Sequence, residues 1–259
     1  MNSPLAIADD LTGAAEIAAV GHRAGWPAEV ITRWSEPREG VLTVLDTDTR
    51  LARPDAAARA LAAIGRSVAR GPPGFVFKKT DSVLRGPVLA ELAALADALG
   101  RRRILLLPAN PSLGRVIRDG HYFVNGVPLH ETAFARDPHH PASTSDVAAL
   151  LGGGVSVCAP GAELPSNGVI VGAAASPEDV AAWARRLDNS MLAAGGRDFF
   201  TAALHALGLG RAAADNTFAP ALPTLLVRGS LASPTRVDDE LELPATVVAG
   251  DAAALDRWI

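Results

Sequence analysis

The sequence predicts an α/β fold built on a mostly parallel sheet with helices on its faces. Short apolar runs, typical of buried strands, alternate with longer segments that carry apolar residues at helical spacing. Polar clusters follow several of these runs, at the strand ends where open α/β sheets bind ligands. The 259 residues, 49% hydrophobic and 20% charged, supply enough apolar material for a sizeable core. Together these observations favour Rossmann-like layers around the sheet.

The alternation is clearest in the first part of the chain, up to residue 107. Gly25 marks the end of the first predicted helix, and Pro54 fits the first turn of the second. The predicted strands are 5–8, 28–32, 41–45, 74–77 and 104–107, and the predicted helices are 14–24, 54–68 and 88–99.

Residues 108–141 interrupt this rhythm and are rich in Pro, Gly, His and Asn. Two short pieces, 121–124 and 127–130, have a β-like pattern. Irregular segments of this length inside compact domains usually carry function or are disordered, and the aromatic and charged content here argues for order. We therefore expect a partly β-like insertion that contributes to a site.

After the insertion the alternation resumes. We expect strands at 155–157, 169–171, 224–227 and 245–248, and helices at 177–187, at 197–207 and after Ser230. Residues 215–223 have the composition of a linker. The sequence therefore predicts an α/β domain over residues 1–214 and a separate remainder over 215–259.

Composition excludes several classes of protein. A net charge of −4 gives no reason to expect nucleic acid or a membrane surface as partner. Cys158 is the only cysteine, so an intrachain disulfide or a multi-cysteine metal site is impossible, which fits a cytoplasmic protein. The N-terminus lacks the basic region of a signal peptide, and no apolar run approaches the ~20 residues of a membrane span.

The most informative segment is 78–87, which lies between the strand 74–77 and the helix 88–99. It places Lys79, Asp81, Ser82 and Arg85 in one turn, at the carboxyl end of a strand and the N-terminus of a helix. Free helix N–H groups and a planar guanidinium both suit an anion. Alternatively, Ser82 is only a helix cap and Arg85 only a surface ion pair. We interpret the turn as a site for a small, polar, negative ligand.

A second polar turn, residues 9–13, follows the first strand. Asp10 or Thr12 can cap the following helix, and capping alone explains one acid. Two adjacent acids at the end of a buried strand repel each other. We therefore expect Asp9 or Asp10 to be a binding or catalytic carboxylate.

Two further strand ends repeat the pattern. Asp48 and Arg50 follow the strand 41–45, where an Asx-type turn and an ion pair are the structural alternatives. Gly114 and Arg115 follow the strand 104–107. Parallel strands end at one edge of a sheet, so these residues are expected to lie beside Asp9 and Lys79.

Metal and phosphate signals are weaker. The spacing of the histidines in the insertion matches no zinc pattern, so we expect no metal site. Gly195-Gly196 and Gly229-Ser230 can cradle phosphate through backbone N–H groups, although glycines at strand ends are common. Neither a Walker-type sequence nor a Gly-x-Gly-x-x-Gly after the first strand is present.

Together these segments resemble the four-carbon acid sugar kinase family. The matching strings are residues 7–14, 46–50 and 79–86 and a series of positions between 108 and 141, with weaker matches at Gly195-Gly196 and Gly229-Ser230. The resemblance implies ATP-dependent phosphorylation of a terminal hydroxyl on a C4 sugar acid such as threonate, erythronate or an oxo-tetronate.

The resemblance also implies two domains, a substrate-binding domain followed by a nucleotide-binding domain. This chain resembles the first of them. After Ser230 the sequence has no Gly-Gly-Asp/Glu-Thr-like string, so residues 215–259 are expected to contain only a remnant of the second domain. ATP and Mg²⁺ would then be bound by a separate nucleotide-binding chain, or near Gly195, Gly196, Gly229 and Ser230. A homo-oligomer is a further alternative. The alternative is a sugar-acid-binding or regulatory protein without catalysis.

On this reading Asp10 or Asp9 orients or deprotonates the accepting hydroxyl. The residues expected to bind the sugar acid are Thr12, Asp48, Arg50, Lys79, Asp81, Ser82, Arg85, Gly114 and Arg115.

Overall fold

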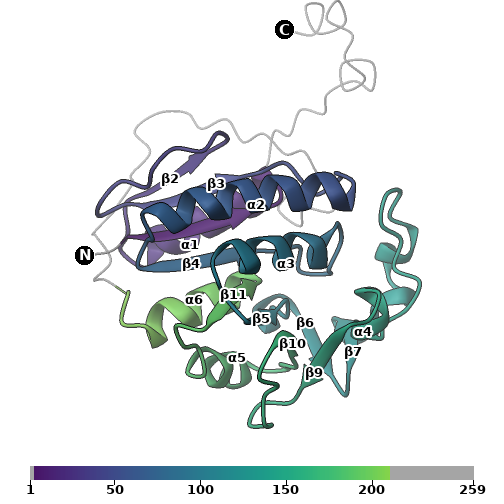
Figure 1. Cartoon of the computed structure of the whole chain (residues 1–259). Coiled ribbons are helices and arrows are strands. Elements are labelled where there is room, and N and C mark those ends of the chain that lie inside the picture. The colour runs from purple at the N-terminus through teal and green to yellow at the C-terminus, as the bar shows by residue number, and fades with distance from the viewer. Residues whose placement is uncertain (1–2, 211–259) are drawn as a thin grey trace, which may run out of the picture. The chain divides into compact units, whose positions relative to one another are not determined.

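An eight-stranded parallel sheet runs through residues 3–210, the part of the chain that the computed structural model describes (Figure 1). Its strand order is β2-β3-β1-β4-β11-β5-β10-β9. A separate antiparallel sheet, β6-β7-β8, lies within the predicted insertion. The strands are β1 (Pro4–Ala8), β2 (Ala28–Ile31), β3 (Leu42–Asp46), β4 (Phe75–Lys79), β5 (Arg103–Leu107), β6 (Arg115–Arg118), β7 (His121–Val124), β8 (Val127–Pro128), β9 (Val155–Cys158), β10 (Gly168–Gly172) and β11 (Met191–Gly195).

Helices cover both faces of the large sheet. The connections β3 to β4 and β4 to β5 progress in one direction along the sheet, whereas β1 to β2 and β10 to β11 progress in the other. Right-handed crossovers therefore place α2 and α3 on one face, where they run side by side (Figure 1), and α1, α5 and α6 on the opposite face. The helices are α1 (Leu11–Arg23), α2 (Pro54–Arg70), α3 (Val88–Ala98), α4 (Val147–Leu150), α5 (Pro177–Ala184) and α6 (Arg197–Ala206), with 3₁₀ turns η1 (Pro111–Leu113), η2 (Leu129–Glu131) and η3 (Ala133–Arg136).

The core lies between these layers and explains the sequence pattern. β1 and β3 are buried along their whole length, as expected for parallel strands covered on both faces. Phe77 of β4 packs against Phe199 and Phe200 of α6, with ring centroids 6.0 and 5.0 Å apart. Among residues 3–210, no helix is long and apolar enough to cross a membrane.

The predicted fold class is confirmed: an α/β fold with a parallel sheet and a β-like insertion. The expected strands 224–227 and 245–248, the linker and the helix after Ser230 lie outside the described residues. The division of the chain at residue 214 stays a prediction.

The largest difference from the sequence prediction is β11, which was not predicted although it lies at the centre of the sheet between β4 and β5. Its sequence, Met-Leu-Ala-Ala-Gly, lacks the β-branched and aromatic residues that usually mark strands. All five residues are buried, so packing between neighbouring strands outweighs this weak local preference.

Two helix boundaries and the insertion also differ. α1 begins at Leu11, three residues earlier than predicted, because the Asp10 carboxylate caps it. α5 ends at Ala184, before the predicted end at 187. Within the insertion, β6 was not predicted, and the segment 127–130 is a two-residue strand followed by a 3₁₀ turn.

The strand register aligns the carboxyl ends that carry polar residues. Ala8 of β1 pairs with Asp46 of β3 and with Lys79 of β4. Gly195 of β11 pairs with Lys79 on one side and with Leu107 of β5 on the other. The turns after these five strands therefore begin at one level along a single edge.

Gly195 provides a test of this arrangement. Its φ is +146°, and a Cβ there would lie 2.1 Å from the carbonyl oxygen of Leu107. We expect Gly195→Ala to lower the free energy of unfolding by about 3 kcal/mol or more, through overpacking and backbone strain. Urea denaturation measures the change. Gly71→Ala is the matched control because nothing lies within 4 Å of its Cβ position. Equal stability of the two variants would contradict the placement of β11.

Candidate functional site

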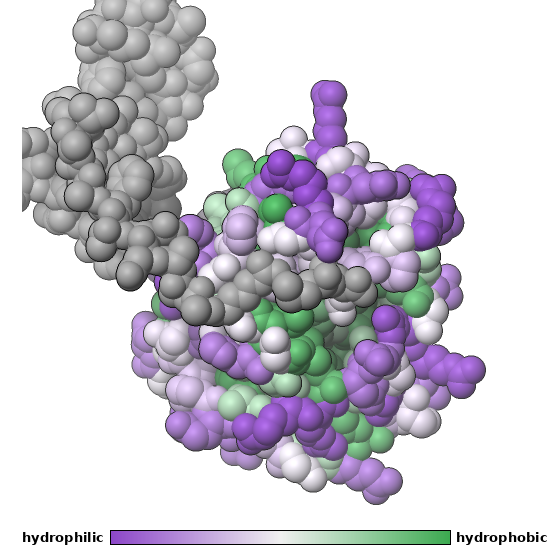
Figure 2. Space-filling model, turned by 90° about the vertical axis from the view of Figure 1, so that its left-hand side faces the viewer, coloured by the Kyte–Doolittle hydropathy of each residue, from purple (hydrophilic) through white to green (hydrophobic). Residues whose placement is uncertain are grey.

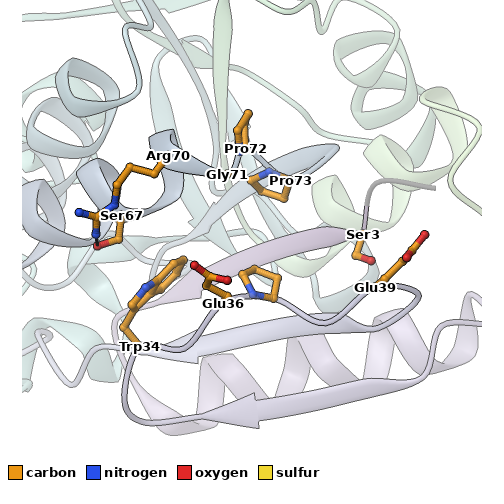
Figure 3. Close-up of a pocket in the computed structure, with 10 residues that line it drawn as sticks. Ser3, Trp34, Glu36, Glu39, Ser67, Arg70, Gly71, Pro72 and Pro73 are labelled. Atoms are coloured by element: carbon orange, nitrogen blue, oxygen red, sulfur yellow. Dashed lines mark hydrogen bonds between the residues drawn. The ribbon is translucent and has the colours of Figure 1, made fainter.

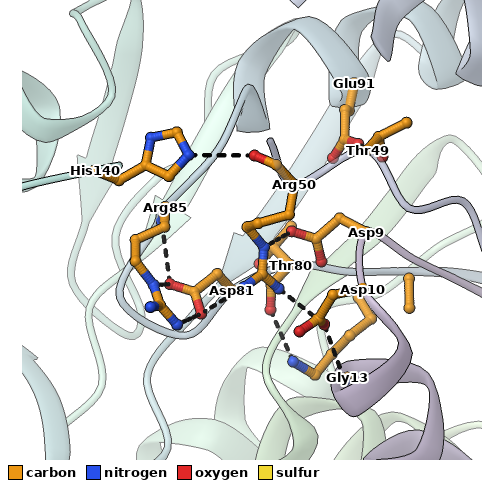
Figure 4. A network of polar contacts seen from close by, with 12 residues as sticks. Asp9, Asp10, Gly13, Thr49, Arg50, Thr80, Asp81, Arg85, Glu91 and His140 are labelled. Carbon is orange, nitrogen blue, oxygen red and sulfur yellow. Dashed lines mark hydrogen bonds and ion pairs between the residues drawn. The ribbon is translucent and has the colours of Figure 1, made fainter. Parts of the chain in front are cut away.

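Arg50, in the loop between β3 and α2, lies at the centre of a group of carboxylates at this edge (Figure 4). Its Nε donates to Asp9 Oδ2, its Nη2 is 2.9 Å from Asp10 Oδ1, and its Nη1 is 3.4 Å from Asp81 Oδ1. Burial opposes the charged form, but the hydrogen bond to Asp9 and the negative charges of Asp9, Asp81 and Asp10 raise the pKa of the Arg50 guanidinium above its ordinary value. One guanidinium thus joins acids from three turns.

The backbone holds Arg50 in this position. The carbonyl oxygen of Asp9 accepts hydrogen bonds from the amides of Thr49 and Arg50, at 3.0 and 3.1 Å. Asp48 has a left-handed φ of 50°, and its amide donates to Asp46 Oδ1 at 2.9 Å, which is the Asx-type turn considered as the structural alternative. The Asp48 side chain is exposed. Its predicted role in binding stays a prediction.

Arg85 is already paired with acids. Its Nε and Nη2 donate to the two carboxylate oxygens of Asp81 at 3.0 and 2.9 Å, and its Nη1 donates to Asp137 Oδ2 at 3.0 Å. Although burial favours the neutral form of Asp81, hydrogen bonds and charge from Arg85, together with Arg50, hold the pKa of this carboxyl below its usual value. The fork of Arg85 is therefore occupied by protein carboxylates.

Asp137 belongs to the insertion and strengthens this pair. Its carboxylate also accepts hydrogen bonds from the amides of His139 and His140. The amide of His140, with smaller contributions from His139 and Arg85, lowers the pKa of Asp137 to about 2. The acid is ionised at neutral pH, and it ties the insertion to the turn after β4.

Arg115, at the start of β6, differs from the other basic groups. The Nη1 of Arg115 donates to Ser82 Oγ, and the guanidinium carbon of Arg115 lies 5.7 Å from the centre of the Phe134 ring. Lys79 Nζ lies 3.3 Å from Glu16 Oε2, and Arg50 and Arg85 are paired as described. Within residues 3–210, Arg115 is the one predicted basic site residue that forms no ion pair with a carboxylate.

Three buried polar atoms near these residues have no hydrogen-bond partner in the described part of the chain: Asp9 Oδ1, Thr80 Oγ1 and Tyr122 Oη. Asp9 and Thr80 directly follow the paired strands β1 and β4. Burial raises the pKa of Tyr122, and the charges of Arg115 and Asp81 act on its hydroxyl. A buried polar atom without a partner costs about 1–3 kcal/mol, so each of these atoms needs an explanation such as a bound water, an ion or a ligand.

Sequence reasoning missed Thr80 and Tyr122. Thr80 lies inside the segment 78–87, and Tyr122 is the only tyrosine of the chain, but neither residue type by itself indicated a site. It also missed Glu91, which lies 2.9 Å from Lys78 Nζ and accepts a hydrogen bond from Thr49. This buried pair joins β4 and α3 to the loop that carries Arg50.

The remaining predicted residues lie at or near the same edge with other roles. Thr12 is exposed in the first turn of α1. Gly114 has a φ of 65°, and a Cβ there would lie 2.1 Å from Asn125 Oδ1, so a tight turn explains this glycine. Gly229 and Ser230 lie outside the described residues.

Gly195 and Gly196 were expected to cradle phosphate. In the structure both glycines are packed closely against neighbouring residues, Leu107 and Asn110 respectively. A Cβ on Gly196 would lie 2.4 Å from Asn110 Oδ1, and that oxygen accepts the amide hydrogen of Asp198 at 3.0 Å. The N-terminus of α6 is therefore capped by a side chain. Among residues 3–210, no three His, Cys, Asp or Glu side chains are grouped to hold a metal ion. Nucleotide binding at Gly195 and Gly196 stays a prediction.

Residues 5–196 match the family described as Sugar-binding N-terminal domain, which is about three quarters of the chain. The chain belongs to this family. It is 35% identical to a D-threonate kinase of Salmonella typhimurium over 150 residues, 57% of this chain and 36% of that protein. It is 32% identical to a D-erythronate kinase of Heliobacterium modesticaldum over 158 residues, 58% of this chain and 36% of that protein. The resemblance to four-carbon acid sugar kinases is thereby confirmed.

The chain spans a little over a third of the length of these curated relatives. A solved structure from Bordetella bronchiseptica, described as a domain of unknown function with bound citrate and as a domain-swapped dimer, matches with a TM-score of 0.71. The two are 26% identical, and the match covers 80% of this chain and 57% of that one.

Two pockets of this sugar-binding domain lie away from the carboxylate cluster. One, of about 500 Å³, opens at the amino ends of β1 and β4 beside Trp34 and Arg70 (Figure 3). Another, of about 570 Å³, lies between α5 and α6 and is mostly apolar. Neither is lined by a basic or acidic residue that was predicted for the site.

Asp10 combines two roles that substitution can separate in this sugar-binding domain. Its Oδ1 accepts the amide hydrogen of Gly13 at 2.9 Å, as a helix cap, and also pairs with Arg50. Asn caps helices as well as Asp does, whereas Ala does not. We expect Asp10→Ala to reduce the free energy of unfolding by about 1 kcal/mol more than Asp10→Asn does, measured by urea denaturation. An equal loss in both variants would show that the cap contributes nothing.

Proposed function

We propose that this domain binds a four-carbon sugar acid, such as threonate, erythronate or 3-oxo-tetronate, and presents it for phosphorylation by ATP. The observation that carries the proposal is Arg115, whose guanidinium has no carboxylate partner among residues 3–210, while every other predicted basic side chain of the site has one. A guanidinium binds a carboxylate through charge-assisted hydrogen bonds. Arg115 is thus the group that takes the carboxylate of the sugar acid.

The hydroxyls of a sugar acid need acceptors and donors at short range. Asp9 Oδ1, Thr80 Oγ1 and Tyr122 Oη are buried polar atoms whose hydrogen-bonding capacity is unused. A polyhydroxy acid supplies several O–H groups on a short chain and is suited to such a set. The acids around Arg50 add acceptors, because Asp10 is only partly buried.

Of the two adjacent acids, Asp9 is the better placed to contact the accepting hydroxyl. Both oxygens of Asp9 are buried, and Oδ1 has no partner, whereas Oδ1 of Asp10 is shared by a helix cap and Arg50. A carboxylate in this role orients the hydroxyl for attack on the γ-phosphate. Asp10 is then a positioning residue that helps to hold Arg50.

The kinase reaction also needs ATP and Mg²⁺, which neutralise the charge of the transferring phosphoryl group. The relatives named as kinases support this activity, and the described residues provide the sugar-acid side of it. We infer that a nucleotide-binding domain, distinct from the described residues, supplies ATP. Binding without phosphorylation is the second outcome of the experiments below.

Titration calorimetry with D-threonate, D-erythronate and 3-oxo-tetronate tests the binding proposal. We expect one of these acids to bind the wild type, and Arg115→Gln to weaken that binding by about 10- to 100-fold, which is the loss of one charge-assisted contact of about 1.5–3 kcal/mol. Arg118→Gln is the matched control, because Arg118 lies on the same strand, is exposed and stacks on Phe123. No binding of any of the three acids to the wild type would contradict the proposal.

Titration of the purified chain with Mg-ATP tests where the nucleotide binds. We expect no saturable binding into the millimolar range, because Gly195 and Gly196 are closely packed and residues 3–210 contain no group of three acidic, His or Cys side chains that could hold a metal ion. Mass spectrometry of a mixture with D-threonate, ATP and Mg²⁺ then reports phosphorylated product. Micromolar binding of Mg-ATP, or product formed by residues 1–259 alone, would contradict the need for a separate nucleotide-binding domain.

A further inference from the structure

Phe134 joins two arginines that come from distant parts of the chain. Its ring centre lies 5.6 Å from the guanidinium carbon of Arg85 and 5.7 Å from that of Arg115. Arg85 belongs to the turn after β4, whereas Arg115 begins β6. Phe134 itself lies in η3, at the end of the insertion.

Hydrogen bonds fix the backbone at Phe134, from which the ring projects. The Phe134 amide donates to Thr132 Oγ1 at 3.2 Å, and its carbonyl oxygen accepts the amide hydrogens of Ala142 at 3.0 Å and Asp137 at 3.2 Å. Asp137 in turn pairs with Arg85. The same short segment therefore fixes the ring and one of the two arginines that contact it.

An aromatic ring and a carboxylate hold a guanidinium in different ways. A carboxylate binds the N–H edge and neutralises the charge, as Asp81 does for Arg85. A ring contacts the flat face and attracts the cation through its quadrupole, while the N–H edge and the full charge stay available. Arg115 has the ring and the Ser82 hydroxyl but no carboxylate, which is the arrangement that keeps a guanidinium ready for an external anion.

We propose that Phe134 is a positioning residue that holds Arg115, with its charge uncompensated, for the carboxylate of the ligand. Arg85, paired with Asp81 and Asp137, stacks on the same ring and fixes the distance between the turn after β4 and the start of β6. The inference rests on the proposed function, because the anion is the carboxylate of the sugar acid.

Calorimetric titration of four proteins with the acid that binds the wild type tests this role. Phe134→Leu removes the aromatic face but keeps an apolar side chain, and Phe134→Tyr keeps the ring. We expect Phe134→Leu to weaken binding by about 3- to 30-fold, the range of cation–π attractions, and Phe134→Tyr to bind within about twofold of the wild type. Phe123→Leu, which removes the ring 5.1 Å from Arg118, is the control and should bind as the wild type does.

Melting temperatures separate positioning from folding. Phe134→Leu and Phe134→Tyr should melt close to each other, so that the difference in affinity follows the ring and not the stability. If Phe134→Leu does not fold, Phe134→Met takes its place under the same criterion. Equal affinity of the leucine variant and the wild type, or equal weakening by leucine and tyrosine, would overturn the inference alone. No binding by the wild type would overturn the proposed function, and this inference with it.

Discussion

The ion-pair network around Arg50 is the constraint on which the site depends. Its guanidinium, 14% exposed, compensates Asp9, which is 2% exposed, and also contacts Asp10 and Asp81. Removing one member of a buried charged group leaves the others uncompensated, which is strongly destabilising. The network therefore fixes the turns after β1, β3 and β4 relative to one another. Gly86 allows the close approach of the last turn, because a Cβ there would lie 2.9 Å from the Arg50 carbonyl oxygen.

This constraint divides the arginines by role. Arg50 and Arg85 pair with protein carboxylates, whereas Arg115 forms no ion pair with a carboxylate among residues 3–210. In the described part of the chain, a guanidinium without a carboxylate partner and several buried oxygens without hydrogen-bond partners suit the proposed ligand, which has one carboxylate and several hydroxyls. The inserted segment contributes Arg115, Phe134 and Asp137, which contact the turn after β4, and Tyr122, whose hydroxyl is influenced by the charges of Arg115 and Asp81.

The fold class and the position of the site could be predicted from the sequence because both follow from simple geometry. Buried parallel strands appear as continuous apolar runs, and parallel strands end at one edge, so Asp9, Arg50 and Asp81 had to lie near one another. β11 could not be predicted, because alanine and glycine carry little preference for strands and only tertiary packing decides their structure.

The pairing of charged side chains inside the site could not be predicted from the sequence. A sequence contains the arginines and the acids but not their pairing: it favours Arg85 as a ligand for an anion, and the structure pairs Arg85 with Asp81 and Asp137. Adjacent lysines on β4 likewise have separate partners, Glu91 for Lys78 and Glu16 for Lys79. The roles of Tyr122 and Phe134 could not be predicted from the sequence, because they depend on the side chains that surround these two residues.

The position of the ligand's carboxylate is the most direct test of this account. A crystal structure of the domain with bound D-threonate or D-erythronate should show the carboxylate at hydrogen-bond distance, about 2.7–2.9 Å, from the guanidinium of Arg115. A hydroxyl of the same ligand should lie within hydrogen-bond reach of Asp9 Oδ1. A carboxylate bound instead to Arg85 or Arg50, with Asp81 or Asp9 displaced from its arginine, would contradict the account.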